Sequence, residues 1–586
     1  MRYGLIGNCK TAALVDDRGS IEWCCLPNFD SPSCFAGILD ANGGGFQVSL
    51  PKPAQVRQSY LPSTNILETE IDDGENAFAV LDYMPRYRDG NEYRHPVEIH
   101  RVLKPLRGRP MVRVTFQPRL NYARGATEIK CRPAVITASC GLESLFLYSS
   151  LPLAGIAAGE FLPLEADHYL LLAYHEKIDP PSLACVREQF DKTKGYWETW
   201  SSRCRLPARY GDAVLRSALA LKLMTFEETG AIIAAPTTSL PEILHEGRNW
   251  DYRYCWLRDA SLVLEALKSI GHFEEASAFI HFLLRIFESK QTKVQIVYGI
   301  DGRSDLEEKI LSHLKGYKNS SPVRIGNNAC HTQQNDIFGE MLNTLYLYYF
   351  YYEIEKMTDD VWSLVKFLVN TIAREWHLQD AGIWEFRHQK AHFTFSKVLA
   401  WVAVDRGIKI AGKIGKGYAS ENWGPIAEQI RKDIEAKGWR DDMGAFTQFY
   451  QSPNYDASLL LMQRYGFLKK DDPRWIATVR SCEKSLVKNG FAFRYTSADD
   501  FGKPKNAFIV ASLWMAKALA SIGDVAGAER LFENILERRN HLGLLSEDVD
   551  PETGELLGNF PQTYSHMAII NTAHLLDRFI EEKGPS

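Results

Sequence analysis

The sequence predicts an α+β multidomain protein in which an N-terminal antiparallel β-sandwich precedes a helical domain. Near residue 180 the apolar pattern changes from short β-branched and aromatic runs to a helical period. A chain of 586 residues also exceeds one compact core of ordinary size. We therefore expect a β-sandwich domain over 1–182, a linker helix over 183–205 and a catalytic helical domain over 206–586.

The first domain is built from short strand-like runs separated by turn signals. Asp73-Gly74 and Asp89-Gly90 supply turn chemistry, and we find no catalytic constellation among these segments. The predicted strands are 65–71, 77–84, 110–118, 134–139, 144–149 and 167–174.

The linker segment is polar and compatible with a helix. Tyr196 and Trp200 are four residues apart and fall on one helical face, close to Trp197. We interpret these rings as anchors between the domains rather than as ligand contacts.

The helical domain contains twelve candidate helices, bounded by glycine, proline and Asp/Asn clusters. Twelve helices with intervening loops suggest six hairpins in a closed double ring, an (α/α)6 barrel, while periodicity alone leaves a solenoid or a bundle open. The predicted helices are 207–229, 256–270, 273–288, 335–356, 359–377, 393–411, 419–437, 454–466, 473–488, 505–521, 524–540 and 561–582.

Composition narrows the class of partner to a small neutral or polar molecule. A formal net charge of −5 gives no general attraction to nucleic acid or to an anionic membrane. The N-terminus lacks the apolar segment of a signal peptide, and the eleven cysteines form no CxxC pair, so we expect a reducing cytoplasm. The dispersed histidines predict no metal and no cofactor, and the oligomeric state stays open.

The first chemically suggestive loop is 249–260, which leads into a predicted helix. Arg258 and Asp259 stand beside Trp250, Tyr252 and Trp256, and such donors, acceptors and flat rings could hold a pyranose. The plainer interpretation is an Arg–Asp pair at a helix start.

Two further loops each carry a glutamate suited to acid–base chemistry. Glu385 lies between Trp384 and Phe386, and a carboxyl group held against aromatic rings loses hydration and becomes a better general acid. Glu547 follows Ser546 and a short apolar run in the segment 543–566, and it is the better base candidate there. Each alone could be a solvated loop residue, but together they offer the carboxyl pair that glycoside hydrolysis needs.

At these motifs the chain resembles glycoside hydrolase family 15, the glucoamylase and bacterial trehalase family, along nearly its whole length. The resemblance rests on Gly-Leu-Ile-Gly-Asn at 4–8, Gly-Ser-Ile-Glu-Trp at 19–23, Asp-Ser-Pro at 30–32, Arg-Asn-Trp-Asp-Tyr-Arg-Tyr-Cys-Trp-Leu-Arg-Asp-Ala at 248–260, Tyr-Gly-Ile-Asp-Gly at 298–302, Pro-Val-Arg-Ile-Gly-Asn at 322–327 and the segment 543–566. It implies a β-sandwich followed by an (α/α)6 barrel.

The resemblance also implies roles for single residues. Glu385 would be the general acid and Glu547 the general base of an inverting hydrolase. The residues implied to contact the sugar are Arg258, Asp259, Tyr252 and Trp256, with Trp384 and Arg324 as further contacts.

Two positions depart from the family pattern. Thr332 stands where a glutamine is usual, and Asn506 where a glutamate is expected, which leaves the fine substrate preference open. We expect an exo-acting hydrolase that releases β-glucose from α-glucan or malto-oligosaccharides. The alternatives are a trehalase and a catalytically silent glucan-binding module.

Overall fold

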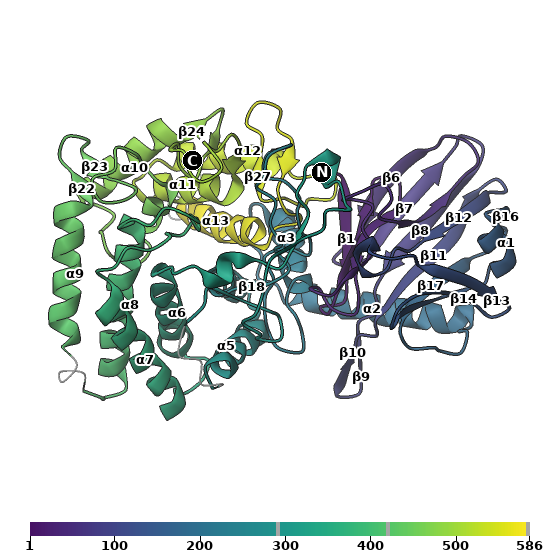
Figure 1. The fold of residues 1–586 in the computed structure, drawn as a ribbon, viewed down its shortest axis with the longest axis horizontal. Helices are drawn as coiled ribbons and strands as arrows, with labels where there is room; N and C mark the ends of the chain where they lie inside the picture. The colour runs from purple at the N-terminus through teal and green to yellow at the C-terminus, as the bar shows by residue number, and fades with distance from the viewer. Residues whose placement is uncertain (289–293, 418–421, 582–586) are drawn as a thin grey trace.

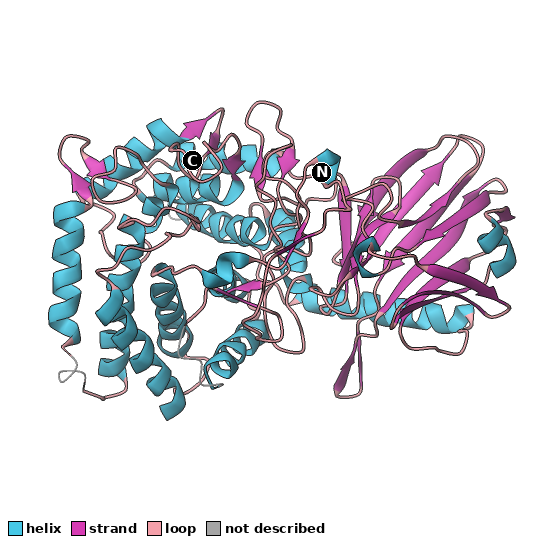
Figure 2. Ribbon diagram, in the orientation of Figure 1, coloured by secondary structure: helices cyan, strands magenta, loops and turns pink. Residues whose placement is uncertain are grey.

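The computed structural model describes residues 1–288, 294–417 and 422–581. A β-rich half carries the N-terminal third of the chain, and a helical half carries the rest (Figures 1 and 2). The predicted fold class is therefore confirmed. The predicted helix start at 419–421 and the chain end at 582–586 lie outside the described residues.

The β-rich half is a sandwich of two antiparallel sheets. One sheet has the order β1-β2-β3-β5-β12-β16, with β4 paired to β3, and the other the order β13-β14-β15-β17-β11-β8-β7-β6. The first sheet comprises β1 Tyr3–Gly7, β2 Ala12–Asp16, β3 Ile21–Cys25, β4 Ser33–Phe35, β5 Gly45–Ser49, β12 Met111–Gln117 and β16 Phe161–Pro163. The second comprises β6 Gln55–Tyr60, β7 Leu67–Asp72, β8 Ala77–Tyr83, β11 Glu98–Arg107, β13 Glu128–Arg132, β14 Val135–Cys140, β15 Glu143–Ser149 and β17 His168–Tyr174.

Strand β8 shows why the second sheet is buried on both faces. Phe78 and Val80 belong to the core between the sheets, whereas Leu81 and Tyr83 belong to the core shared with the helices. The Tyr83 hydroxyl donates to the Val186 carbonyl of α2 (Leu183–Ser202), which runs along this face (Figure 1). A short helix, α1 (Leu153–Ala158), and a hairpin of β9 (Tyr87–Asp89) and β10 (Glu92–Arg94) complete this half.

The helical half forms a closed inner ring. Successive contacts run from α4 to α6, α8, η6, α11 and α13 and back to α4. The remaining helices pack outside this ring, as an (α/α)6 barrel requires. The helices are α3 Gly211–Leu223, α4 Leu257–Ser269, α5 Phe273–Glu288, α6 Asp336–Tyr346, α7 Asp359–Glu375, α8 Thr394–Lys413, α9 Trp423–Lys437, η6 Ala457–Leu461, α10 Pro473–Leu486, α11 Ile509–Ser521, α12 Val525–Glu537 and α13 Thr563–Glu581.

The segment predicted as a helix over 454–466 is only a short 3-10 helix, η6. Asp456 accepts hydrogen bonds from the backbone nitrogen and the hydroxyl of Ser458 and caps the start of η6. The backbone bonds that follow, such as the Met462 nitrogen to the Leu459 carbonyl, are of the 3-10 type. The turn closes at Gly466, whose φ is +78°. The apolar residues of η6 still fill their place in the inner ring.

The architecture places the long loops at one end of the barrel. The segments before α4, α6, α8, η6, α11 and α13 each lead into the N-terminus of an inner-ring element. Because these N-termini share one end of the ring, residues far apart in the sequence are brought together there.

Candidate active site

A cleft with an empty volume of about 940 Å³ opens among these loops. Seven of the eight predicted site residues line it: Tyr252, Trp256, Arg258, Asp259, Trp384, Glu385 and Glu547. The eighth, Arg324, is not among the lining residues. Its guanidinium lies 4.7 Å from the centre of the Trp250 ring, one layer behind the surface of the cleft.

Glu547 is held by one oxygen and leaves the other free. Its Oε1 accepts a hydrogen bond from the Tyr252 hydroxyl at 2.6 Å, and its Oε2 has no hydrogen-bond partner among the described residues. Glu547 lies in a loop that is bonded to the start of α11, because the Ile509 nitrogen donates to the Glu547 carbonyl. A Cβ at Gly558 would lie 2.7 Å from this Oε2, so glycine is required beside the carboxylate.

Burial and neighbouring charges both change the pKa of the Glu547 carboxyl. Burial raises the pKa of Glu547 well above its usual range, and the Glu242 and Asp548 charges raise it further. Arg494 and the Tyr252 hydroxyl oppose this rise. Arg494 forms ion pairs with Glu242 and, at 3.5 Å, with Asp548.

Glu385 contacts Trp256, the aromatic neighbour of Tyr252, from another loop. Its Oε1 accepts a hydrogen bond from Trp256 Nε1 at 2.9 Å and lies 3.5 Å from Arg258 Nη2. Its backbone has a φ of +62°, a left-handed conformation that is uncommon for a residue with a side chain. Such local strain concentrates at functional sites.

Tyr252 and Trp256 connect the two glutamates. Their ring centres are 5.4 Å apart in an edge-to-face contact, and each ring donates one hydrogen bond to one of the carboxylates. The two carboxyl groups therefore line one cleft, and no hydrogen bond joins them in the described part of the chain.

Arg258 organises the buried end of the cleft. It lies in the first turn of α4 and bonds to Asp259 Oδ1 at 3.1 Å and to Gln334 Oε1 at 2.8 Å. Burial raises the pKa of Asp259 to about 6, although Arg258 favours its ionised form. The interpretation of this pair as a plain helix start is thus incomplete, because both side chains line the cleft.

Polar atoms without protein partners also face this region. The Tyr564 hydroxyl is buried and has no partner among the described residues, and Tyr564 and Gln562 line the cleft. Trp384 is fixed beside them because its Nε1 donates to both oxygens of Asp456, at 3.0 and 2.9 Å. A ligand rich in hydroxyl groups would satisfy such orphaned atoms.

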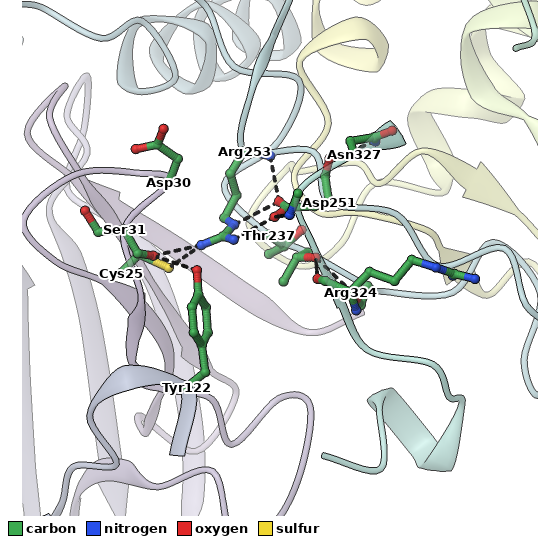
Figure 3. A network of polar contacts seen from close by, with 12 residues as sticks. Cys25, Asp30, Ser31, Tyr122, Thr237, Asp251, Arg253, Arg324 and Asn327 are labelled. Atoms are coloured by element: carbon green, nitrogen blue, oxygen red, sulfur yellow. Dashed lines mark hydrogen bonds and ion pairs between the residues drawn. The ribbon is translucent and has the colours of Figure 1, made fainter. Parts of the chain in front are cut away.

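The loop that carries Tyr252 and Trp256 is tied to the β-sandwich. Arg253 is fully buried, pairs with Asp251 at 2.6 Å and donates to the Ser31 carbonyl at 2.8 Å (Figure 3). Its guanidinium lies 5.4 Å from the centre of the Tyr122 ring, which belongs to the same domain as Ser31. The β-sandwich therefore positions one wall of the cleft.

Several cleft residues escaped the sequence analysis. Glu242 and Arg494 are buried, and the segment 499–501 lies far along the chain from Trp250 and Arg387, which it contacts. Their shared signal is position, because Glu242 lies in the long segment before α4, whereas Arg494 and 499–501 lie in the segment before α11, and both segments lead into inner-ring helices. No metal-binding group of three or more His, Cys, Asp or Glu residues occurs in the described part of the chain.

Known structures and sequences define the class of protein. The structure is similar to a bacterial glucoamylase complexed with acarbose, with a TM-score of 0.72 at 13% identity over 98% of this chain and 94% of that one. At this identity the likeness concerns the fold, which this chain shares with that glucoamylase.

Sequence comparison then identifies the family. The model of glycosyl hydrolases family 15 matches residues 208–574, and a trehalase-like N-terminal model matches residues 1–151. A relative named trehalase from Mycolicibacterium smegmatis is 36% identical over all of this chain and 92% of its own length. A trehalase from Thermoplasma volcanium is 33% identical over 98% and 93%. The chain belongs to glycoside hydrolase family 15, as its motifs indicated.

No helix in the described part of the chain is long and apolar enough to cross a membrane.

Proposed function

We propose that this enzyme hydrolyses α,α-trehalose with inversion at the attacked anomeric carbon. The motifs fit malto-oligosaccharides and trehalose equally well, and we expected the former because they cover more of the family. The relatives favour trehalose, because those aligned over nearly the whole chain at 31–36% identity are named trehalase. The glucoamylase likeness comes from a structure only 13% identical and concerns the fold.

In the proposed mechanism Glu547 is the general base. Tyr252 fixes its Oε1, so the unpartnered Oε2 is available to take a proton from water. This free, buried oxygen in the same cleft as Glu385 is the observation that carries the proposal. A raised pKa brings the carboxyl closer to the working pH, where an ionised base of higher proton affinity is more effective.

Glu385 is the proposed general acid. It gives its proton to the oxygen between the two sugars while water, losing a proton to Glu547, attacks the anomeric carbon from the opposite face. Trehalose and water then become one β-glucose, from the attacked ring, and one α-glucose, the leaving sugar. Arg258 and Asp259 at the buried end are proposed to hold hydroxyls of the attacked glucose.

The other proposed contacts shape the space for the sugars. Trp256 and Tyr252 would pack against the attacked glucose, and Trp384 beside Glu385 would contact the ring from a second side. Arg324 would act indirectly, through the Trp250 ring that it covers.

A substrate panel tests the proposal. The purified chain should give its highest kcat/KM on trehalose, compared with maltose, isomaltose and maltotriose. A preference for maltotriose would favour the glucoamylase alternative, and no turnover of any substrate would favour a silent binding module.

A further inference from the structure

Trp250 forms part of the cleft wall and is covered by charged groups. The Arg387 and Arg324 guanidinium carbons lie 4.2 and 4.7 Å from its ring centre, and the edge of Phe501 approaches at 5.3 Å between centroids. Its Nε1 donates to Glu242 Oε1 at 3.1 Å. The ring is therefore held on several sides rather than free to move with a ligand.

Glu308 forms ion pairs with both arginines and links them. Its Oε1 pairs with Arg324 Nε at 3.0 Å and its Oε2 with Arg387 Nη2 at 2.9 Å, and its side chain is only 10% exposed. Arg324 Nη1 also donates to the carbonyls of Gly247 and Asn249, both at 2.9 Å. These contacts hold both guanidinium groups in place over the Trp250 ring.

A distant loop completes the wall. Asp499 forms two hydrogen bonds with Arg248, at 2.8 and 2.5 Å, and both side chains are buried. Asp500 accepts a hydrogen bond from the Arg387 backbone nitrogen at 2.5 Å. Trp250, Arg387 and the segment 499–501 thus form one continuous surface of the cleft, which we call the rim.

The rim stands beside the catalytic pair. Arg387 is two residues from Glu385, and Trp250 is two residues from Tyr252, which bonds to Glu547. Asp251 forms a β-bridge with Thr238, so the backbone around it is extended. The Cα atoms of Trp250 and Tyr252 are then about 7 Å apart, a distance comparable with one pyranose ring. Arg258 and Asp259, which also line the cleft, are more deeply buried, with side chains that are 9% and 13% exposed.

We propose that the rim ends the leaving-group subsite after one sugar and so restricts the enzyme to disaccharides. This inference rests on the proposed function of Glu385 and Glu547. It assigns Trp250, held by Arg387 and Arg324, a role in selecting substrate length. A third glucose would clash with the Trp250 ring, which cannot move aside, whereas both sugars of trehalose would fit inside the cleft.

The test is a chain-length series on Trp250→Ala. The measured quantity is kcat/KM for maltotriose divided by kcat/KM for the better of trehalose and maltose. We expect this ratio to be at least tenfold below one in the wild type and to rise at least tenfold in Trp250→Ala. The matched control is Trp439→Ala, a half-buried tryptophan in β22 (Trp439–Arg440) outside the cleft, which should leave the ratio unchanged.

The outcomes separate this proposal from the one on which it rests. If maltose is hydrolysed but trehalose is not, the trehalase proposal fails while the ratio still tests the rim. If the wild type cleaves maltotriose as well as a disaccharide, or if Trp250→Ala leaves the ratio unchanged, the rim proposal is wrong. Should Trp250→Ala not fold, Arg387→Ala removes a side chain that is 25% exposed and must show the same rise.

Discussion

Replacing Tyr252 by phenylalanine removes one hydroxyl and keeps the ring. That hydroxyl donates to Glu547 Oε1 at 2.6 Å and lowers the pKa of Glu547 against the effect of burial. A hydrogen bond to a charged group contributes about 1.5–3 kcal/mol. Since one pKa unit corresponds to about 1.36 kcal/mol, its loss should raise the pKa of Glu547 by roughly 1–2 units.

The sign of the effect on activity follows from the proposed role of the base. Glu547 must be ionised to accept a proton from water, so activity falls as the pH drops through its pKa. In Tyr252→Phe the acidic limb of kcat/KM on trehalose should therefore move to higher pH by roughly 1–2 units. Because Glu547 interacts with Glu242 and Asp548, this limb reports the group of carboxyls together.

The assay is the pH profile of kcat/KM on trehalose for wild type and variant. Tyr465→Phe is the matched control, because Tyr465 also donates from a buried hydroxyl to a glutamate, Glu340, but lies outside the cleft. The control should leave the limb in place. An unmoved acidic limb in Tyr252→Phe, with an unchanged rate, would refute the role of Glu547 as base.

Four other substitutions test the site. Glu385→Gln and Glu547→Gln should each lower kcat by about 10²–10⁴-fold with folding preserved, and near-wild-type rates would contradict the assignment. Gly558→Ala should lower kcat at least tenfold, because the added Cβ would lie 2.7 Å from Glu547 Oε2. Gly523→Ala is the control: Gly523 has a φ of +90°, so the substitution strains the backbone, but no atom lies within 4 Å of the added Cβ. This control should keep kcat. Burial raises the pKa of Asp548 to about 8, so Asp548 and Glu547 titrate together. Asp548→Asn removes this acidic neighbour, so the acidic limb should move to lower pH, and a shift to higher pH would oppose the electrostatic account.

The sequence predicted the elements of the fold better than their contacts. Apolar periodicity located the inner-ring helices because each must bury one face, and it located strands such as β7, whose residues alternate between buried and half-buried. It also predicted a helix over 454–466, because apolar periodicity does not distinguish an α-helix from the short 3-10 helix η6 that forms there.

In the candidate site, too, local motifs were predictable from the sequence and long-range contacts were not. Motif residues such as Glu385 and Glu547 were found because each sits in a recognisable local pattern. Glu242 and Arg494 were not, since their ion pair joins residues that are 252 positions apart and no local pattern marks either one. Arg324 was placed among the sugar contacts, but only the folded chain shows that it covers Trp250 from behind.

The anomeric form of the fresh products tests the central claim most directly. Proton NMR during the first turnovers on trehalose should show α-glucose and β-glucose appearing in equal amounts, because only the attacked ring is inverted. Initial products consisting of α-glucose alone would mean retention, and they would contradict a water activated by Glu547 opposite the proton donor Glu385.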